Sequence, residues 1–277
     1  MRSAKVVDDY APAVRIEGAA AVVTGASSGI GAAIAEQLAR GGANVAVVAR
    51  RADRLEQTAA ACRVHSPASV AFAADVADRA ACERVVAAAV GRFGAVDILV
   101  NNAGISLHRS AAETTVEDIE RVMAVNFFGA VYLTMAALPG MLERGRGSIV
   151  NVTSVAGYVP NLKESAYGAS KAALSRWSHG LAVDLHGRGV HVGVLSPGPI
   201  DTEIWLTEGE EPYTGKLYPP EIVAAAALRM IEQETVHRTA PSRFGAVGAL
   251  YPLLGRAMRW GIRRFEPRAT TSSDLSP

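Results

Sequence analysis

AAAVVTGASSGIG, residues 19–31, is the stretch of this chain that decides its fold. A short apolar run leads into a turn with the glycine spacing GxxxGxG, and apolar residues then recur at helical spacing at Ile34 and Leu38. Glycine lets the backbone turn tightly and approach a pyrophosphate, and the N-terminus of the following helix favours negative charge. The stretch therefore predicts a strand, a phosphate-binding turn and a helix. The predicted turn residues are Gly25, Ser27, Ser28, Gly29, Ile30 and Gly31.

The same alternation of apolar runs and helical patterns continues toward the C-terminus. Further strands are predicted over residues 44–49, 70–74, 98–101, 148–152 and 190–195. Helices are predicted around Arg54 and Glu56 and over residues 82–93, 115–123, 126–144, 167–185 and 221–233. Short buried strands that alternate with helices are typical of a parallel sheet covered on both faces. The predicted fold class is α/β, a Rossmann-type doubly wound parallel sheet in three layers, which binds its ligand at the carboxyl ends of the strands.

Length and composition fit one globular domain. The 277 residues are 49% hydrophobic and 20% charged. We predict an N-terminal leader over residues 1–18, one nucleotide-binding domain over residues 19–243 and a C-terminal segment over residues 244–277. Residues 198–220 show no periodicity, and a loop of this length within a compact domain is usually functional. We therefore expect this loop to contact substrate.

Charge and cysteine content argue against several functions. The formal net charge of +1 argues against a nucleic-acid binder, which normally has a basic excess. The two cysteines, Cys62 and Cys82, form no metal-ligand pattern, so we expect no metal site and reduced thiols. The N-terminus lacks the apolar core of a signal peptide, and no uncharged apolar run reaches the roughly 18 residues that span a bilayer. We expect a cytoplasmic protein.

The C-terminal segment has an amphipathic pattern. Apolar residues recur at helical spacing at Val247, Leu250, Tyr251, Leu254, Met258 and Ile262, while Arg256, Arg259 and Arg263 lie on another face. Such a basic helix can lie on a membrane surface, cover a substrate pocket or pack against a second subunit. Packing against protein is the favoured interpretation, and Pro252 is placed to kink the helix.

The end of the second predicted strand bears on the choice of cofactor. Proteins of this fold that bind NAD place an acidic residue there to accept hydrogen bonds from the ribose. This chain has Val48-Ala49-Arg50-Arg51 instead, and a guanidinium suits a 2′-phosphate. We therefore predict NADP(H) over NAD(H), with Arg50 as the first candidate and Arg51 as the second. The alternative is that both arginines are solvated surface residues.

Together, several motifs resemble the short, single-domain branch of the short-chain dehydrogenases/reductases. The resemblance covers residues 19–202 and continues more weakly to about residue 233. It is carried by Thr24–Gly31, Asn101-Asn102-Ala103-Gly104, Ser154, Tyr167-Gly168-Ala169-Ser170-Lys171 and Pro197-Gly198. The resemblance implies an oxidoreductase that interconverts an alcohol and a ketone. It also implies a homodimer or homotetramer, formed through the helices that bear Asn126 and Tyr167.

The Tyr167-to-Lys171 spacing makes chemical sense of that activity. Hydride transfer to a carbonyl builds negative charge on its oxygen, which must then take a proton. Tyr167 has such a proton, but a phenol has a pKa near 10. Lys171 lies four residues later, on the same helical face, and its ammonium is expected to lower the pKa of Tyr167, together with the positive nicotinamide of the oxidised cofactor. Tyr167 is then the general acid in reduction and the general base in oxidation.

The resemblance implies roles for further residues. Ser154 is expected to hydrogen-bond the substrate oxygen, Asn126 to hold a water that links Lys171 to solvent, and Lys171 also to bind the nicotinamide ribose. Asn126, Ser154, Tyr167 and Lys171 are thus the candidate catalytic set. Further expected cofactor contacts are Asp75, Val76, Asn102, Ala103, Gly104, Pro197, Gly198, Ile200 and Thr202. Asp97 is expected to be structural.

The substrate is the least constrained feature. Candidate pocket residues are Leu107, His108, Val155, Tyr158, Val159 and the loop over residues 198–220, with Glu208, Glu210 and Glu211 nearby. Their apolar and aromatic character favours an apolar small molecule over a sugar phosphate, and His108 is expected to be an ordinary loop histidine. Three alternatives stay open: a non-catalytic NADP-binding scaffold, a membrane-surface reductase of lipid-like carbonyls, and the larger epimerase/dehydratase branch, against which the short chain argues.

Overall fold

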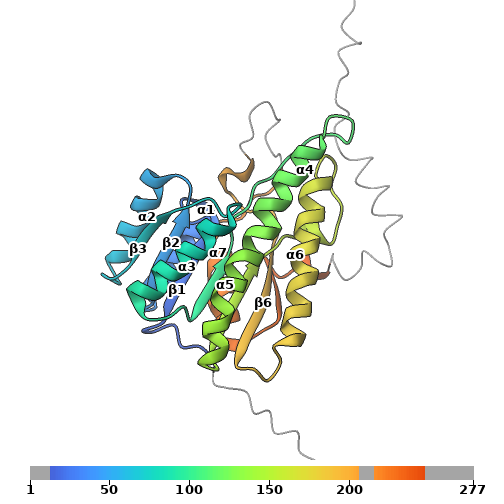
Figure 1. Ribbon diagram of the computed structural model, residues 1–277. Helices are drawn as coiled ribbons and strands as arrows, with labels where there is room; N and C mark the ends of the chain where they lie inside the picture. Colours follow the sequence, from blue (N-terminus) through green and yellow to red (C-terminus); the bar gives the residue numbers. More distant parts are fainter. Residues whose placement is uncertain (1–12, 206–214, 247–277) are drawn as a thin grey trace, which may run out of the picture.

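A seven-stranded sheet forms the centre of the protein in a computed structural model, which describes residues 13–205 and 215–246 (Figure 1). All neighbouring strands pair in parallel, in the order β3-β2-β1-β4-β5-β6-β7. The strands are β1 (Ala20–Thr24), β2 (Asn44–Ala49), β3 (Val70–Ala73), β4 (Ile98–Asn101), β5 (Gly147–Val152), β6 (Val190–Pro197) and β7 (His237–Ala240). The predicted doubly wound parallel sheet is confirmed.

Helices cover both faces of the sheet. Against one face pack α1 (Gly29–Arg40), α2 (Ala52–Arg63) and α7 (Pro220–Gln233). Against the other pack α3 (Arg79–Phe93), α5 (Gly129–Glu143) and α6 (Ser165–Asp184). The helix α4 (Val116–Met123) leads into α5 through the π-helical turn η1 (Ala124–Phe128). Two short 3₁₀ turns, η2 (Val155–Gly157) and η3 (Glu203–Trp205), follow β5 and β6.

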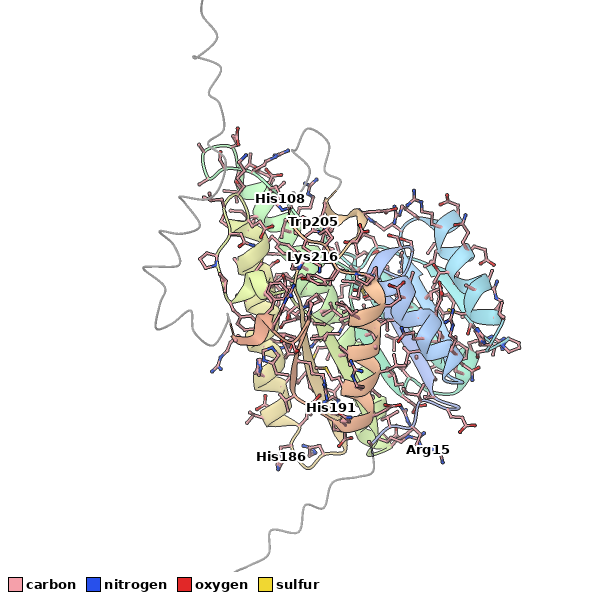
Figure 2. The ribbon with its side chains drawn as sticks, turned by 180° about the vertical axis from the view of Figure 1, so that it is seen from behind. Arg15, His108, His186, His191, Trp205 and Lys216 are labelled. Carbon is pink, nitrogen blue, oxygen red and sulfur yellow. The ribbon has the colours of Figure 1, made fainter. Side chains whose placement is uncertain are left out.

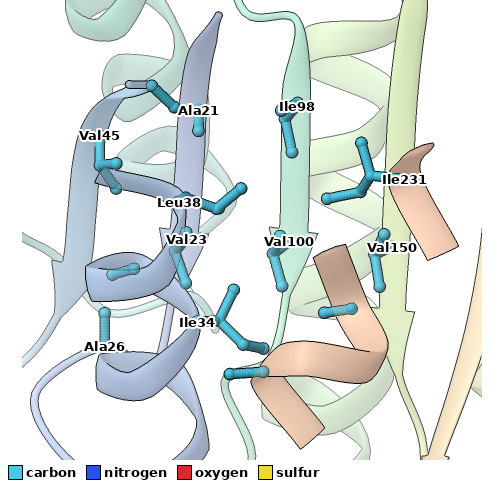
Figure 3. Close-up of a cluster of buried hydrophobic side chains, with 14 of the residues drawn as sticks. Ala21, Val23, Ala26, Ile34, Leu38, Val45, Ile98, Val100, Val150 and Ile231 are labelled. Atoms are coloured by element: carbon cyan, nitrogen blue, oxygen red, sulfur yellow. The ribbon is translucent and has the colours of Figure 1, made fainter. Parts of the chain in front are cut away.

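The core follows the two-residue period of the strands. Ala21 and Val23 of β1 point to the α1 side of the sheet, where they meet Ile34 and Leu38, whereas Val22 packs in the cluster on the α5 side (Figure 3). All of these side chains are fully buried. Because both faces are covered, the strands other than β7 are mainly apolar, which is why the sequence shows continuous apolar runs instead of alternation.

Local capping explains where some helices begin. Asp78 accepts a hydrogen bond from the Ala80 backbone N at 2.9 Å, so α3 begins at Arg79 and not at the predicted Cys82. Thr115 and Asp118 form a capping box at α4, as the predicted start at residue 115 requires. The two helices predicted over residues 115–123 and 126–144 are joined into one run by η1.

Two predicted segments lie largely outside the described residues. They are most of the N-terminal leader and nearly all of the C-terminal amphipathic segment, including its apolar and arginine positions. The acids Glu208, Glu210 and Glu211 of the predicted substrate loop also lie outside. The described ends of that loop are tied together, because Ile200 bridges Tyr218 and the Trp205 indole donates to the Ile200 carbonyl at 2.7 Å.

Candidate active site

The glycine-rich turn between β1 and α1 has a backbone that leaves no room for side chains. Gly25 has a φ of +64°, and a Cβ at this position would lie 2.8 Å from the Ala103 Cα. A Cβ at Gly31 would lie 2.4 Å from the Gly25 carbonyl oxygen. The close approach leaves the turn and the first backbone amides of α1 as a bare cradle at the carboxyl edge of the sheet. This geometry fits the pyrophosphate of a dinucleotide.

The end of β4 braces this cradle. The Asn102 side-chain amide donates to the Thr24 carbonyl at 3.0 Å, and the Asn102 backbone N donates to the Thr24 hydroxyl at 3.0 Å. The Ala103 backbone N shares the same hydroxyl, also at 3.0 Å. These contacts fix β4 against the turn. The structure therefore places Asn102 and Ala103 against the glycine-rich turn, and the cofactor contacts of Asn102, Ala103 and Gly104 stay predictions.

Ser154, Tyr167 and Lys171 meet beyond the end of β5. Ser154 lies just before η2, buried to 9% exposure, and a hydrogen bond joins it to the Tyr167 hydroxyl. Lys171, one helical turn after Tyr167 in α6, is 3% exposed and its Nζ lies 5.9 Å from the centre of the tyrosine ring. That Nζ donates to the Val152 carbonyl at 3.0 Å, which ties α6 to the end of β5.

Burial has the largest effect on the pKa values of Tyr167 and Lys171. It raises the pKa of Tyr167 to about 12, the nearby Glu164 carboxylate acts in the same direction, and the hydrogen bond with Ser154 opposes them. Burial also lowers the pKa of Lys171 to about 8. The expected lowering of the Tyr167 pKa is thus absent in the chain by itself, because the loss of water around a phenolate outweighs the stabilising contacts. At neutral pH Tyr167 carries its proton.

Asn126 lies in the π-helical turn η1 and is 1% exposed. Its Oδ1 accepts from the Ile105 backbone N at 2.8 Å, and its Nδ2 donates to the Ile105 carbonyl at 2.9 Å and to Ser170 Oγ at 3.0 Å. A Cβ at Gly104 would lie 3.3 Å from Lys171 Nζ and 3.4 Å from Asn126 Oδ1. The two side chains therefore border the same small space beside Gly104, and a water held between them stays a prediction.

The segment after β6 closes the other side of the cradle. A Cβ at Gly29 would lie 2.8 Å from Thr202 Cγ2, so Thr202 lies directly on the glycine-rich turn. Gly198 packs against the Phe244 ring, and a Cβ there would lie 2.7 Å from it. Ile200 is buried, with 3% exposure. Thr202 thus borders the cradle, while the cofactor contacts of Pro197, Gly198 and Ile200 stay predictions.

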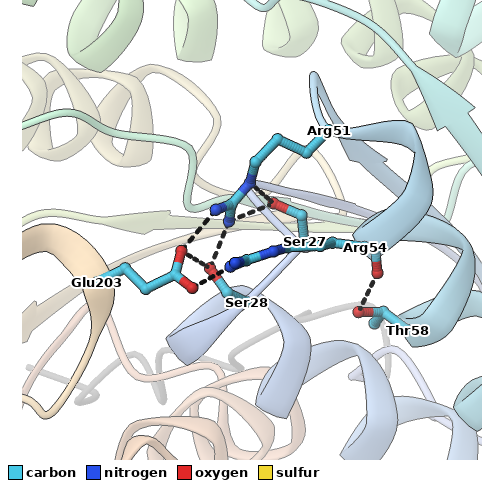
Figure 4. A network of polar contacts seen from close by, with 6 residues as sticks. All are labelled: Ser27, Ser28, Arg51, Arg54, Thr58 and Glu203. Carbon is cyan, nitrogen blue, oxygen red and sulfur yellow. Dashed lines mark hydrogen bonds and ion pairs between the residues drawn. The ribbon is translucent and has the colours of Figure 1, made fainter.

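The two arginines after β2 behave differently. Arg51 donates to Ser27 Oγ at 3.0 Å and to Ser28 Oγ at 2.8 Å, so its guanidinium lies on the glycine-rich turn (Figure 4). It also pairs with Glu203 of η3, its Nη1 lying 2.6 Å from the carboxylate Oε2. Arg50 is exposed at the end of β2. Arg51 is therefore the arginine of this pair that the structure brings to the turn.

Sequence reasoning missed a buried acid beside Tyr167. Glu164 is 6% exposed, and its carboxylate lies 2.7 Å from His108 Nε2 and 2.7 Å from Asn161 Nδ2. The His108 ring also lies 5.8 Å from the Trp205 ring, and Figure 2 shows the two side by side. His108 thus contacts both Glu164 and Trp205. An acid three residues before Tyr167 was the available signal, but its contact with His108 comes from a loop 56 residues earlier in the chain.

The predicted residues Tyr158, Val76 and Asp75 have contacts outside the group of Ser154, Tyr167 and Lys171. The Tyr158 hydroxyl lies 2.8 Å from Ser175 Oγ of α6 and 3.3 Å from Ser196 Oγ of β6, so it is engaged between these elements. Val76 is buried against Gly129, while Asp75 is exposed and accepts from the Ala77 backbone N at 3.0 Å.

Asp97 has the structural role that was expected. It accepts from the Ala20 backbone N at 3.1 Å and pairs with Arg146, its Oδ1 lying 3.3 Å from the guanidinium. It lies just before β4, at the edge of the sheet opposite the cradle, so its contacts hold β1 to β4.

Comparisons with known proteins agree with this geometry. Residues 19–212 match a family model described as short chain dehydrogenase. D-threitol dehydrogenase of Mycolicibacterium smegmatis is 39% identical, over 77% of this chain and 86% of that protein. The 3-ketoacyl-(acyl-carrier-protein) reductase of Brucella melitensis, solved with NADH, is 31% identical with a TM-score of 0.72, over 78% of this chain and 91% of that one. A short chain dehydrogenase/reductase of Burkholderia phymatum, solved with NAD, is 25% identical with a TM-score of 0.80, over 94% and 99% of the two chains.

Proposed function

The chain belongs to the short-chain dehydrogenase/reductase family, and from this premise we propose that it interconverts a secondary alcohol and a ketone with NADP(H). The observation that carries the proposal is the meeting of Ser154, Tyr167 and Lys171 beside the glycine-rich cradle. A proton donor, a hydrogen-bond donor for an oxyanion and a buried ammonium are the groups that carbonyl reduction requires.

Each of these side chains has a defined task. A nicotinamide bound beside the cradle would supply or accept the hydride. Tyr167 Oη gives its proton to the substrate oxygen in reduction and takes it back in oxidation, and its raised pKa keeps that proton in place at neutral pH. Ser154 Oγ hydrogen-bonds the same oxygen. Lys171, held by the Val152 carbonyl, places positive charge beside the tyrosine.

Asn126 acts on Lys171 as a positioning residue. Its side chain hydrogen-bonds the backbone N and carbonyl of Ile105 and borders the space beside Lys171 Nζ. Its fixed amide would hold a water there and so connect the ammonium to solvent. The π-helical turn supports this role, because single π-turns occur preferentially at functional sites.

The preference for NADP(H) rests on this chain's own arginines. The two solved relatives described above hold NADH and NAD, so the cofactor class is shared but the phosphate is not. At the end of β2 this chain has Arg50 and Arg51 where an acid would bind the ribose of NAD. Arg51 reaches the turn through Ser27 and Ser28, and its guanidinium suits a 2′-phosphate.

The proposed substrate class rests on the apolar side chains near Tyr167 and Ser154. Leu107 packs with Val122 and Ala166 next to Tyr167, while Val155 lies in η2 just after Ser154. These side chains are apolar, and we propose a small, mainly apolar alcohol or carbonyl compound as the substrate.

Substitution of Tyr167 tests the mechanism. Tyr167→Phe removes the proton donor and keeps the ring, so turnover should fall by at least 10³-fold, within the roughly 10²–10⁴-fold that acid–base catalysis contributes. Fluorescence titration should show that NADPH still binds with nearly unchanged affinity. Retained turnover would remove Tyr167 from the proton-donor role. Unchanged cofactor binding, with no turnover by the wild type on any carbonyl or alcohol of a broad panel, would instead favour a cofactor-binding scaffold.

A further inference from the structure

Glu203 connects Arg51 and Arg54, at the start of α2, with the phosphate-binding turn. One carboxylate oxygen, Oε2, lies 2.6 Å from Arg51 Nη1 and accepts from Ser28 Oγ at 3.2 Å. The other, Oε1, pairs with Arg54 Nη1 (Figure 4). Arg51 and Arg54 are three residues apart, so both guanidinium groups reach the same side of the first turn of α2. Glu203 comes from η3, about 150 residues further along the chain.

These donors form a seat for an anion. Two guanidinium groups and a hydroxyl converge on one carboxylate, which is the donor set that phosphate and carboxylate ligands require. Arg51 is the N-cap of α2 and Ser28 is the N-cap of α1, so two helix N-termini add favourable potential for negative charge. The side chains of Arg51, Arg54 and Glu203 are 44%, 45% and 39% exposed. A ligand from solvent can therefore reach the seat.

A 2′-phosphate and the Glu203 carboxylate would compete for this seat. The seat lies at the end of β2, beside the cradle, where the proposed function requires the 2′-phosphate of NADPH. A phosphate has more acceptor oxygens and more negative charge than a carboxylate, so it satisfies the two arginines better. NADH has no group of this kind and leaves the ion pairs intact.

We propose that Glu203 is an internal surrogate for the 2′-phosphate, and that NADPH displaces it from a seat formed by Arg51, Arg54 and Ser28. This inference rests on the proposed preference for NADP(H). It adds Arg54 to the phosphate-binding residues and makes Glu203 a determinant of cofactor selectivity. Thr202, the residue before Glu203, lies directly on Gly29, and this contact places Glu203 next to the turn.

Removing the carboxylate tests the competition. Wild type and Glu203→Gln would be titrated with NADPH, NADH and 2′-AMP, using fluorescence for the dinucleotides and calorimetry for the nucleotide. Exposed ion pairs are individually weak, so the dissociation constants of NADPH and 2′-AMP should fall by about three- to tenfold in the variant. The constant for NADH should change less than twofold. Glu56→Gln is the matched control, because it removes an exposed carboxylate of α2 that pairs with Arg63 instead.

Removing the second arginine tests the seat itself. Arg54→Gln should raise the dissociation constants of NADPH and 2′-AMP about tenfold and leave that of NADH unchanged. Arg63→Gln, on the same helix, should change none of them. Thermal unfolding of each variant without ligand shows that it is folded.

The outcomes separate this inference from the proposed function. Wild-type protein that binds NADPH no better than NADH would overturn both. Wild-type protein that prefers NADPH, with no gain in Glu203→Gln over its control, would overturn the competition alone. Equal weakening of NADPH and NADH in Glu203→Gln would also overturn it, because Glu203 would then be a contact to the bound dinucleotide.

Discussion

Lys171 carries an ionisable group in a place that disfavours its charge. Its side chain is 3% exposed, and burial lowers its pKa from 10.5 to about 8. The unfolded chain therefore binds more protons than the folded chain between these two values. The free energy of unfolding should rise with pH across this window, by up to roughly 3 kcal/mol from this group. Tyr167 acts in the opposite direction only above pH 10, where its raised pKa keeps a proton that the unfolded chain loses.

Substitution of Lys171 makes this dependence measurable. At pH 7 the urea midpoint of unfolding of Lys171→Met should be higher than that of wild type, because the substitution removes the cost of burying the ammonium. The difference between the two midpoints should be smaller at pH 9.5. Lys216→Met, at an exposed lysine, is the control, and its difference from wild type should not depend on pH. A difference in urea midpoint between Lys171→Met and wild type that stays constant from pH 7 to 9.5 would contradict a lowered pKa of Lys171 in the ligand-free chain.

Arg50 and Arg51 can be distinguished by their effect on cofactor choice. The sequence favoured Arg50, but the structure directs Arg51 to Ser27 and Ser28. Hydrogen bonds to charged groups contribute about 1.5–3 kcal/mol, so Arg51→Ala should weaken NADPH at least tenfold. The dissociation constant of NADH should change less than threefold in Arg51→Ala. Arg50→Ala should also weaken NADPH more than NADH, but by a smaller factor. Titration of both variants with both cofactors checks this, and equal losses for NADPH and NADH would remove either arginine from the phosphate site.

Residue types that carry chemistry were predictable where they belong to a local pattern. The tyrosine and lysine lie one helical turn apart, so a single helix brings them together. The contacts of Glu203 and Glu164 were not predictable in this way. Glu203 meets α2 from across the fold, and Glu164 contacts both its near neighbour Asn161 and His108, which lies 56 residues earlier in the chain.

At the scale of elements, the turn between β1 and α1 has a strict packing requirement. A Cβ at Gly31 would lie 2.4 Å from the Gly25 carbonyl oxygen and 2.6 Å from Asn102 Nδ2. Gly31→Ala should therefore push the turn away from β4, with a loss of about 1–3 kcal/mol in the free energy of unfolding and of most NADPH affinity.

Gly91 is the matched control for that substitution. It lies in α3, and a Cβ there would meet no atom within 4 Å. Gly91→Ala should raise the free energy of unfolding by up to about 1 kcal/mol and leave cofactor binding unchanged. Urea unfolding and NADPH titration of both variants provide the test. Wild-type affinity in Gly31→Ala would show that the turn can widen without loss of the cradle.

Helices and strands were predictable from the sequence where their burial leaves a clear pattern of apolar residues. Six of the strands are apolar runs, and the sequence marks each of them. β7 has the sequence HRTA, with no apolar run, and it forms because it pairs with β6 at the edge of the sheet. The π-helical turn at Asn126 has no propensity signal either, because it depends on how α4 and α5 pack in the whole molecule.

At the scale of the whole molecule, one helical face is left uncovered by the residues that the structure describes. The run Val116–Glu143 has 28 residues with a mean hydropathy of 1.6 over its most apolar window, and half of that window is buried within the fold. Phe128 and Met135 of this run are 42% and 56% exposed, and Val183 of α6 is 75% exposed. The helices α5 and α6 lie side by side on one face of the molecule (Figure 1). Exposed apolar surface of this kind marks an interaction site.

We expect a second copy of the chain to cover this face and form a homodimer or homotetramer. Met135→Glu places a charge where apolar side chains would meet, so it should shift the protein toward the monomer by at least tenfold in dissociation constant. Val64→Glu is the control, because Val64 is also exposed, at 77%, but lies at the end of α2. Sedimentation velocity over a range of concentrations measures the effect. An unchanged assembly in Met135→Glu would move the subunit interface to another face, and a monomeric wild type would leave this apolar surface for a different partner.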